Sequence, residues 1–452
     1  GERIQFDKNV KFIFETHSLQ FASPATVSRM GVLFVNRSDF DLQLTFPAIM
    51  AGKDNTYCQL FKTLVPIALE TIEQYSSNFV FNFTDLQILR NIIPHIEGMN
   101  QPIPFMLAIA RACSSLLSPS YQEKFVDQFI KRAAKECGSK LPSMKNILQA
   151  EWKDGRLQPF EYQQLNENEW NAVEPPFVST PDSLKYVAAA SPIVQRQEPL
   201  LIAGPKGCGK TILVKKLYEG DVEYIYCNAL TSSKTVMTRL NELCTTAPGA
   251  KGLRMKPRSG RPLTLFFKGI QNPNADKFDT VELHSFIRQL CQLNGYTNET
   301  LDWVELTNIN IVASIDPSDS LQPLSERFLS QFRVVVVDYL NSENLRFIYS
   351  KYLTFVLQKD QAFCSELAKN LIVVYDQFLQ NNGFTPKDIT SWIIGILRYV
   401  EEQPTMSILY ESYRVFADRL PPSKQKEFGQ IVKKNIGDKL GIYTTFGQTD
   451  NL

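Results

Sequence analysis

The chain has 452 residues, of which 44% are hydrophobic, and its 48 Lys and Arg residues nearly balance 47 Asp and Glu residues. This length and apolar content predict about three compact units with buried cores. The balanced charge gives no case for nucleic acid or an anionic membrane as a partner, and no window approaches the roughly 20 apolar residues that would cross a bilayer. The eight cysteines include no C-x-x-C pair, which is typical of reduced thiols in the cytosol.

Residues 9–35 read as two buried strands joined by a short segment that contains Arg29. The same strand, segment and strand pattern recurs at 308–338, where Arg327 takes the place of Arg29. A repeat of about 300 residues predicts two consecutive copies of one α/β fold. Because the chain starts at Gly1 in the middle of this pattern, we expect the first copy to be incomplete. Two such stretches can also arise by chance in any α/β chain.

A helical region is predicted between these two patterns. Apolar residues recur at helical spacing, with prolines between the segments, over 58–76, 84–94, 103–117 and 120–137. A polar connector rich in Asn, Gln and Glu follows at about 151–172. Ser179-Thr-Pro-Asp182 then predicts the start of another helix, with Pro at its first position. The basic stretch Lys251–Arg261 is interpreted as a solvated loop.

Residues 200–211 carry the most informative motif, a buried strand that runs into G-x-x-x-x-G-K-T. The glycines let successive backbone N–H groups point at phosphate oxygens, Lys210 adds a positive charge near the β- and γ-phosphates, and the Thr211 hydroxyl can ligate Mg²⁺. Helical spacing over 212–218 also directs a helix N-terminus at the phosphates. The sequence therefore predicts a site for ATP or ADP, with Mg²⁺ held by Thr211. Its phosphate-binding residues are Gly204, Pro205, Lys206, Gly207, Cys208, Gly209, Lys210 and Thr211.

The hydrolytic half of such a site is missing from the sequence. A P-loop ATPase carries a second strand that ends in Asp-Glu, where Asp holds Mg²⁺ and Glu orients the attacking water. The matching strand here, 262–267, ends in Lys268-Gly269, and Asp276 and Asp279 come too late. Lys268 instead brings a second cation towards the phosphates. We expect a pocket that binds a nucleotide and hydrolyses it poorly.

A P-loop core followed by a helical lid resembles the AAA+ ATPases, which implies an α/β fold with a parallel sheet, flanking helices and helical lid subdomains. The lid helices are expected over 342–358, 361–381, 386–402 and 404–419. Several segments narrow the resemblance to dynein heavy-chain motors: Gly1-Glu-Arg-Ile-Gln-Phe6, Ala25-Thr-Val-Ser-Arg29-Met-Gly, Leu324-Ser-Glu-Arg-Phe328, Phe384-Thr-Pro-Lys-Asp388 and Tyr410-Glu-Ser-Tyr-Arg-Val-Phe-Ala-Asp-Arg-Leu420. Within that family, Leu-Phe-Phe-Lys-Gly at 265–269 most resembles the intraflagellar-transport heavy chains.

Dyneins carry six such modules in one ring, so the resemblance implies a register. The expected units are the end of the second module's αβ core (1–35), its helical lid (36–150), a linker (151–172), the third module's αβ core (173–338) and its lid (339–452). The resemblance implies neighbouring modules as partners, with microtubules and accessory chains bound by regions outside this sequence. It also implies a place in the cytoplasm, the cytoskeleton and the cilium.

The family's residue roles fall on five further positions. Arg29 matches the arginine finger that reaches the first module's nucleotide, and Arg327 the finger that reaches the second module's nucleotide. Asp316 stands at a polar sensor position where dyneins more often have Asn. Lys387 matches a second sensor in the lid, where Arg is usual, and Val178 lies in a segment that resembles the adenine-packing strip. From the residues alone, each arginine could equally be a surface ion-pair residue.

Two other functions stay open at this point. A stand-alone AAA+ remodeller would need its own turnover, which Lys268-Gly269 argues against, and a scaffold with a vestigial P-loop is disfavoured by the intact Gly209-Lys210-Thr211. The three histidines, His17, His95 and His284, have no metal-ligand partners at suitable spacing and are interpreted as structural.

Overall fold

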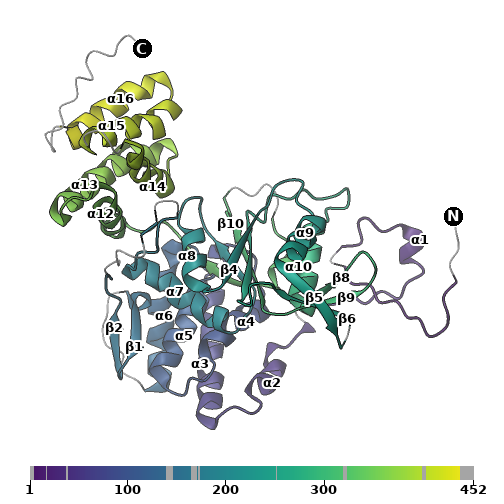
Figure 1. Cartoon of the computed structure of the whole chain (residues 1–452). Helices are drawn as coiled ribbons and strands as arrows, with labels where there is room; N and C mark the ends of the chain where they lie inside the picture. The colour runs from purple at the N-terminus through teal and green to yellow at the C-terminus, as the bar shows by residue number, and fades with distance from the viewer. Residues whose placement is uncertain are drawn as a thin grey trace.

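The computed structural model describes residues 5–16, 18–36, 39–138, 146–163, 170–171, 174–250, 252–318, 323–399 and 404–437. His17 lies outside these residues. Figure 1 shows a first helical region (α2–α6) packed below an α/β core, a second helical region (α12–α16) on the opposite side of that core, and the N-terminal segment extending away from both.

The predicted strands within residues 9–35 do not form, and this part of the prediction is wrong. The segment holds one short helix, α1 (Pro24–Val27), capped by Ser23, and no described strand pairs with any of residues 5–36. Its apolar side chains lie open, with Ile13 96% and Leu33 92% exposed. A strand needs a neighbour to pair its backbone groups, and apolar periodicity alone does not supply one.

The four helices predicted in the first helical region are confirmed within a few residues. Pro102 and Pro119 open two of them, where a missing N–H costs nothing, and Thr84 and Gln87 form a capping box at a third. Their apolar faces bury Phe61, Phe105 and other side chains in one cluster that continues into the core. The elements are α2 (Phe46–Met50), α3 (Asn55–Glu73), α4 (Asp85–Ile96), α5 (Pro102–Ser114) and α6 (Pro119–Cys137).

The connector predicted at 151–172 contains regular structure in its first part. Strands β1 (Ala150–Lys153) and β2 (Arg156–Pro159) pair antiparallel. Asp154 and Gly155 join them with positive φ angles of 51° and 73°, as an Asp-Gly hairpin turn requires. The hairpin was not predicted because this stretch is polar.

The core is a five-stranded parallel sheet in the order β11-β3-β10-β7-β4. One face packs on α7 (Pro181–Gln195) and α8 (Lys210–Leu217), and the other on α9 (Ser233–Leu243) and α10 (Glu282–Leu293). Strands buried on both faces are expected of a parallel sheet between helices. The α/β P-loop fold predicted from the sequence is confirmed. The strands are β3 (Leu200–Ala203), β4 (Asp221–Tyr226), β7 (Leu263–Lys268), β10 (Ile309–Ile315) and β11 (Arg333–Val336).

A second, four-stranded sheet lies beside the core in the order β5-β6-β9-β8. It corrects the interpretation of Lys251–Arg261 as a loop, because residues 252–257 form β6. In β6 the exposed Arg254 and Lys256 alternate with the buried Met255 and Pro257, so the charges mark one face of a strand. The elements are β5 (Cys244–Gly249), β6 (Gly252–Pro257), β8 (Gly295–Thr297) and β9 (Trp303–Leu306).

The second helical region has its own apolar core around the fully buried Trp392, whose Nε1–H donates to Ile408 O at 2.8 Å. Its helices are α12 (Ser342–Leu357), α13 (Gln361–Val374), α14 (Pro386–Gly395), α15 (Pro404–Val415) and α16 (Pro422–Val432). A cleft of about 400 Å³ between α14 and α15 is lined by Arg398, Arg414 and Arg419 among others. The buried Glu411 pairs with Arg398 and Arg414.

The two helical regions repeat one local structure. In the first, Gln122 Nε2 donates to Leu117 O at 3.2 Å, and in the second, Gln425 Nε2 donates to Leu420 O at 3.0 Å. A fully buried phenylalanine stands three residues after each glutamine, namely Phe125 in α6 and Phe428 in α16. The spacing of about 300 residues matches that between Arg29 and Arg327, so a repeat is seen here and not in the strands where the sequence indicated it.

Candidate nucleotide site

The predicted phosphate loop connects β3 to α8, and two of its glycines have positive φ angles. These are 81° at Gly207 and 98° at Gly209, which glycine adopts readily and other residues do not. At the end of β3, Gly204 N–H donates to Ile315 O at 3.1 Å, and a Cβ at Gly204 would collide with Val337 O. The loop is therefore held against β10 and β11 by a backbone that only glycine allows.

Lys210 is the first residue of α8 and turns back over the loop. Its Nζ donates to the carbonyl oxygens of Gly204 at 2.6 Å and Pro205 at 2.8 Å. Thr211 follows it in the first turn of α8, whose N-terminal N–H groups and dipole favour an anion. The ammonium group thus lies at the loop, where a phosphate group could replace the two carbonyls as its partner.

Lys268 ends β7, in register with Ser314 of β10 and Tyr226 of β4. Its Nζ lies 4.7 Å from the ring centroid of Tyr226 and 5.5 Å from that of Tyr224, within the range of a cation–π interaction. Burial lowers the pKa of Lys268, and the positive charges of Lys387, Lys210 and Lys215 lower it further. The Lys268 ammonium therefore stands against two rings of β4, and the charges of the other two predicted lysines, Lys210 and Lys387, act on it.

Gly269 occupies the position of the water-orienting carboxylate, and its backbone differs from a continuing strand. Its φ is 72°, and a Cβ there would lie 2.7 Å from Asn272 Nδ2. The N–H groups of Gly269 and Ile270 both donate to Ser314 O at 3.1 Å. The missing carboxylate thus comes with a change in backbone conformation, and a side chain at this position would be strained.

Asp316 directly follows β10, and its carboxylate is engaged by its own loop. Oδ1 accepts hydrogen bonds from Ser318 N at 3.1 Å and Ser318 Oγ at 2.6 Å. Asp316 lies near Tyr339, whose pKa is raised by burial first and then by Cys208, Asp316 and other acidic groups. The Tyr339 hydroxyl donates to Lys206 O at 2.7 Å. Asp316 is therefore beside the phosphate loop, with one carboxylate oxygen already occupied.

The second helical region touches the phosphate loop through the start of α14. A Cβ on Gly207 would lie 2.5 Å from Thr385 Oγ1 and 3.4 Å from Lys387 Cβ. Thr385 and Asp388 form a capping box there, and Arg419 donates to Asp388 Oδ1 at 2.6 Å. This cap holds Lys387 at the loop.

Val178 lies where the core meets the second helical region. It is 4% exposed and packs within the apolar cluster of α12–α16. Ser183 Oγ donates to Val178 O at 3.2 Å, and Tyr352 of α12 donates to Pro176 O at 2.7 Å. The segment that resembles an adenine-packing strip thus packs between the α/β core and the second helical region.

The two predicted arginine fingers lie away from this loop. Arg29 is exposed just after α1, which Figure 1 places at the far end of the molecule from α8. Arg327 lies on α11 (Glu326–Leu329), and its guanidinium pairs with Glu15 Oε2 of the N-terminal segment at 2.9 Å. Arg29 is therefore part of the N-terminal segment, and Arg327 belongs to the part of the core that contacts this segment.

Some site residues were missed by the sequence. Tyr339 carries a signal, since it comes soon after β11 and so lies at the carboxyl edge of the sheet. Thr385 is recognisable as the first residue of a capping box. Tyr224 and Tyr226 give none, because their contact with Lys268 depends on the pairing of β4 with β7.

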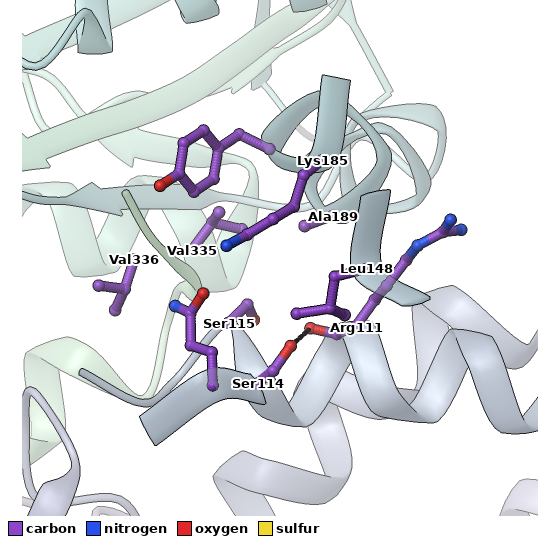
Figure 2. Close-up of a pocket in the computed structure, with 10 residues that line it drawn as sticks. Arg111, Ser114, Ser115, Leu148, Lys185, Ala189, Val335 and Val336 are labelled. Carbon is purple, nitrogen blue, oxygen red and sulfur yellow. Dashed lines mark hydrogen bonds between the residues drawn. The ribbon is translucent and has the colours of Figure 1, made fainter. Parts of the chain in front are cut away.

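Figure 2 shows a different pocket, at the joint between the first helical region and the core. It is lined by residues of α5, α7 and β11, including Arg111, Lys185 and Val335, and holds about 10 Å³. Lys185 points towards Ser115 whereas the guanidinium of Arg111 points away from it. That volume admits about one water molecule, so this pocket is not the nucleotide site.

Magnesium, which this class of site usually holds, fits these residues poorly. Mg²⁺ prefers six oxygen ligands, with carboxylates and phosphates among them. Thr211 offers one hydroxyl, and Lys268 stands where a carboxylate is needed. Within the described parts of the chain, no group of three or more His, Cys, Asp and Glu residues could hold a metal ion.

A parallel sheet with a phosphate loop after β3, together with a helical unit that reaches that loop, defines an AAA+ P-loop NTPase module. Residues 167–340 match the family described as the P-loop containing dynein motor region. The chain is similar to cytoplasmic dynein 2 heavy chain 1 of Caenorhabditis elegans (30% identity over 96% of the chain), Chlamydomonas reinhardtii (29% over 98%) and Homo sapiens (27% over 100%). These matches confirm the predicted resemblance to dynein heavy-chain motors.

The chain spans only 11–12% of the length of these relatives. Among the helices of the described residues, none combines the length and the apolar character that a membrane span requires. A P-loop of this family implies nucleotide binding.

Proposed function

We propose that this chain is a regulatory nucleotide-binding segment of the dynein motor ring. It would comprise the end of the second AAA+ module and the whole of the third, whose site retains ATP or ADP without hydrolysing it. The observation that carries the proposal is an intact phosphate loop after β3, combined with Lys268-Gly269 at the end of β7, in the same sheet. Phosphoryl transfer needs a carboxylate that helps hold Mg²⁺ and a group that orients the water, and neither residue supplies one.

The register of two consecutive modules is supported by the repeated glutamine-to-leucine hydrogen bond in α6 and α16. Under this register, residues 1–35 belong to the second module's core. Arg327 pairs with Glu15, one of these residues, as a finger directed at that module would; the same exposed contact fits the alternative of a surface ion pair. Exposed pairs contribute little stability, so this contact is evidence of direction rather than of strength.

Arg29 would act in the same way on the first module's nucleotide. A planar, permanently charged guanidinium suits the neutralisation of γ-phosphoryl oxygens. Its exposure after α1 leaves it free to cross an interface. The partners are thus neighbouring modules of the same heavy chain, with microtubules and accessory chains bound elsewhere. Similarity to cytoplasmic dynein 2 heavy chains favours retrograde intraflagellar transport in the cilium.

The test is analysis of the nucleotide that is released when the purified chain is denatured. We expect copurified ADP or ATP without steady turnover, and Lys210→Ala should abolish it. Lys234→Ala, an exposed position on α9 at the other face of the sheet, serves as the control and should retain nucleotide. Unchanged nucleotide content in Lys210→Ala would contradict the P-loop interpretation.

The same measurement separates the alternatives. Steady hydrolysis by the isolated chain would favour a stand-alone AAA+ remodeller. A chain that binds no nucleotide would favour a scaffold with a vestigial loop.

A further inference from the structure

We propose that Lys268 takes the place of the magnesium ion, so that this site binds a nucleoside di- or triphosphate without a divalent metal. The proposal rests on nucleotide binding at the phosphate loop and specifies what neutralises the phosphates there. It starts from the disagreement between the usual ion of such sites and the residues that are present.

The first argument is the face on which Lys268 lies. Side chains alternate along a strand, so Lys268 shares a face of β7 with Phe266. Phe266 packs in the cluster that contains Leu213 and Val214 of α8. Lys268 therefore projects on the side of the sheet that carries α8, the helix that begins at Lys210.

The second argument is reach. One strand, β10, separates β7 from β3, which leads into the phosphate loop. Two strand spacings amount to about 10 Å, and Lys268 pairs with Ser314 one residue before the end of β10. In the structure the Lys268 ammonium stands against Tyr224 and Tyr226 of β4, on the other side of β7, so the side chain has to turn towards β10 to reach a phosphate at the loop. The positive charges of Lys387 and Lys210 both lower the pKa of Lys268.

The third argument is charge. Lys210 and Lys387 lie at the loop and Lys268 lies at the end of β7, and their charges oppose one another unless an anion lies between them. The nearest candidate for a compensating carboxylate after β10, Asp316, already accepts two hydrogen bonds from Ser318. A diphosphate carries about three negative charges near neutral pH, because its last pKa is close to that of other phosphate monoesters. It would balance the three lysines without a metal.

The fourth argument is the placement of the ammonium group before any ligand arrives. The rings of Tyr224 and Tyr226 hold Lys268 at the edge of the sheet. Burial penalises the charged form of Lys268. A phosphate partner would offset that penalty. A site of this kind is prepared to receive an anion and repels a second cation.

The experiment titrates a fluorescent ADP analogue into nucleotide-stripped protein, once with Mg²⁺ and once with EDTA. We expect the two dissociation constants of the native chain to agree within about threefold. Lys268→Met keeps the length of the side chain and removes its charge, and it should weaken binding about 10- to 100-fold in both buffers, the range for a hydrogen bond to a charged group. Lys268→Asp should make binding depend on Mg²⁺. Lys234→Met, on α9 at the other face of the sheet, is the control and should bind like the native chain.

A native chain that loses tenfold or more of its affinity in EDTA would overturn the proposal while leaving nucleotide binding intact. No binding in either buffer would instead overturn the proposed function, and this inference with it. If Lys268→Met fails to fold, as a melting curve without nucleotide would reveal, the comparison of the two buffers with native protein still decides.

Discussion

The side-chain amide of Asn91 pairs with both backbone groups of Val334. Its Oδ1 accepts from Val334 N–H at 3.0 Å, and its Nδ2 donates to Val334 O at 3.5 Å. Two residues further along β11, Val336 N–H donates to Ser115 O at 2.8 Å. Because β11 is the edge of the sheet, α4 and α5 satisfy backbone groups that would otherwise be open to pairing with another chain. The first helical region and the core are joined along this edge.

Replacing Asn91 by Leu should destabilise the chain. The change keeps the number and branching of the side-chain heavy atoms but removes both hydrogen-bonding groups, and it leaves a buried backbone N–H without a partner, which costs about 1–3 kcal/mol. We expect the free energy of unfolding, measured in urea, to fall by that amount. Leu86→Ala, at an exposed position on the same helix, is the control and should change stability by less than about 0.5 kcal/mol. Equal effects of the two substitutions would show that the edge contact contributes nothing.

Acid should loosen the same joint through His95. Its Nδ1 lies 3.0 Å from Asn91 O and its Nε2 2.8 Å from Ala189 O of α7. Burial, opposed in part by these two carbonyls, lowers the pKa of His95 from 6.5 to about 4. Between pH 6.5 and about 4, His95 therefore binds a proton in the unfolded chain but not in the folded chain. Stability attributable to His95 is fully present above pH 6.5 and is lost as the pH falls to about 4, by about 3 kcal/mol in all.

The measurement is the melting temperature of native protein and of His95→Gln between pH 7.5 and 4. The variant should lose less stability across this interval than the native chain. His284, whose pKa is also lowered by burial, provides the comparison, because His284→Gln should leave the contribution of His95 in place. Parallel curves for native protein and His95→Gln would contradict the assignment.

A methyl group on Gly207 should push the second helical region away from the phosphate loop. The new Cβ would lie 2.5 Å from Thr385 Oγ1, at a φ of 81° that alanine resists. We expect Gly207→Ala to weaken ADP binding and to lower the melting temperature. Gly260→Ala, with a φ of 74° and nothing within 4 Å of its Cβ, isolates the backbone strain. If both variants bind ADP equally well, contact between Thr385 and the loop has no part in binding.

Arg29→Ala should impair the whole motor rather than this chain's own site. Arginine fingers contribute about 10³- to 10⁵-fold in turnover where they act fully. In the parent heavy chain we expect a sharp fall in ATPase rate and in microtubule gliding, with poor rescue by Arg29→Lys because the planar fork is lost. Arg327→Ala should have the smaller effect. Near-normal turnover of Arg29→Ala would exclude the finger role.

Sequence predicted well those parts of the structure that depend on local signals. The phosphate loop follows from glycines at fixed spacing, and α5 and α6 from prolines at their first turns. The substitution of Lys268-Gly269 for two acids was also visible without a structure. The place of Lys387 in the site was predicted from resemblance to a family and not from the spacing of residues.

Features that depend on pairing between distant segments were missed. Periodicity predicted strands in 9–35, but nothing among the described residues pairs with them. The β6 part of the β5–β6 hairpin was interpreted as a loop because of its charged residues, which lie on one exposed face. The contact of Lys268 with Tyr226 and the capping of β11 by Asn91 join residues 42 and 243 positions apart, respectively, and no local rule encodes such contacts.

The repeated helical regions carry opposite charges at matching positions. Counted from their capping threonines, Thr84 and Thr385, the same number of residues leads to Glu97 in the first region and to Arg398 in the second. Glu97 pairs with Arg196 of the core that packs on it, whereas Arg398 borders the open cleft beside α14. Arg398 also pairs with Glu411 of its own region, so the same position supports internal packing in the second region and contact with the core in the first.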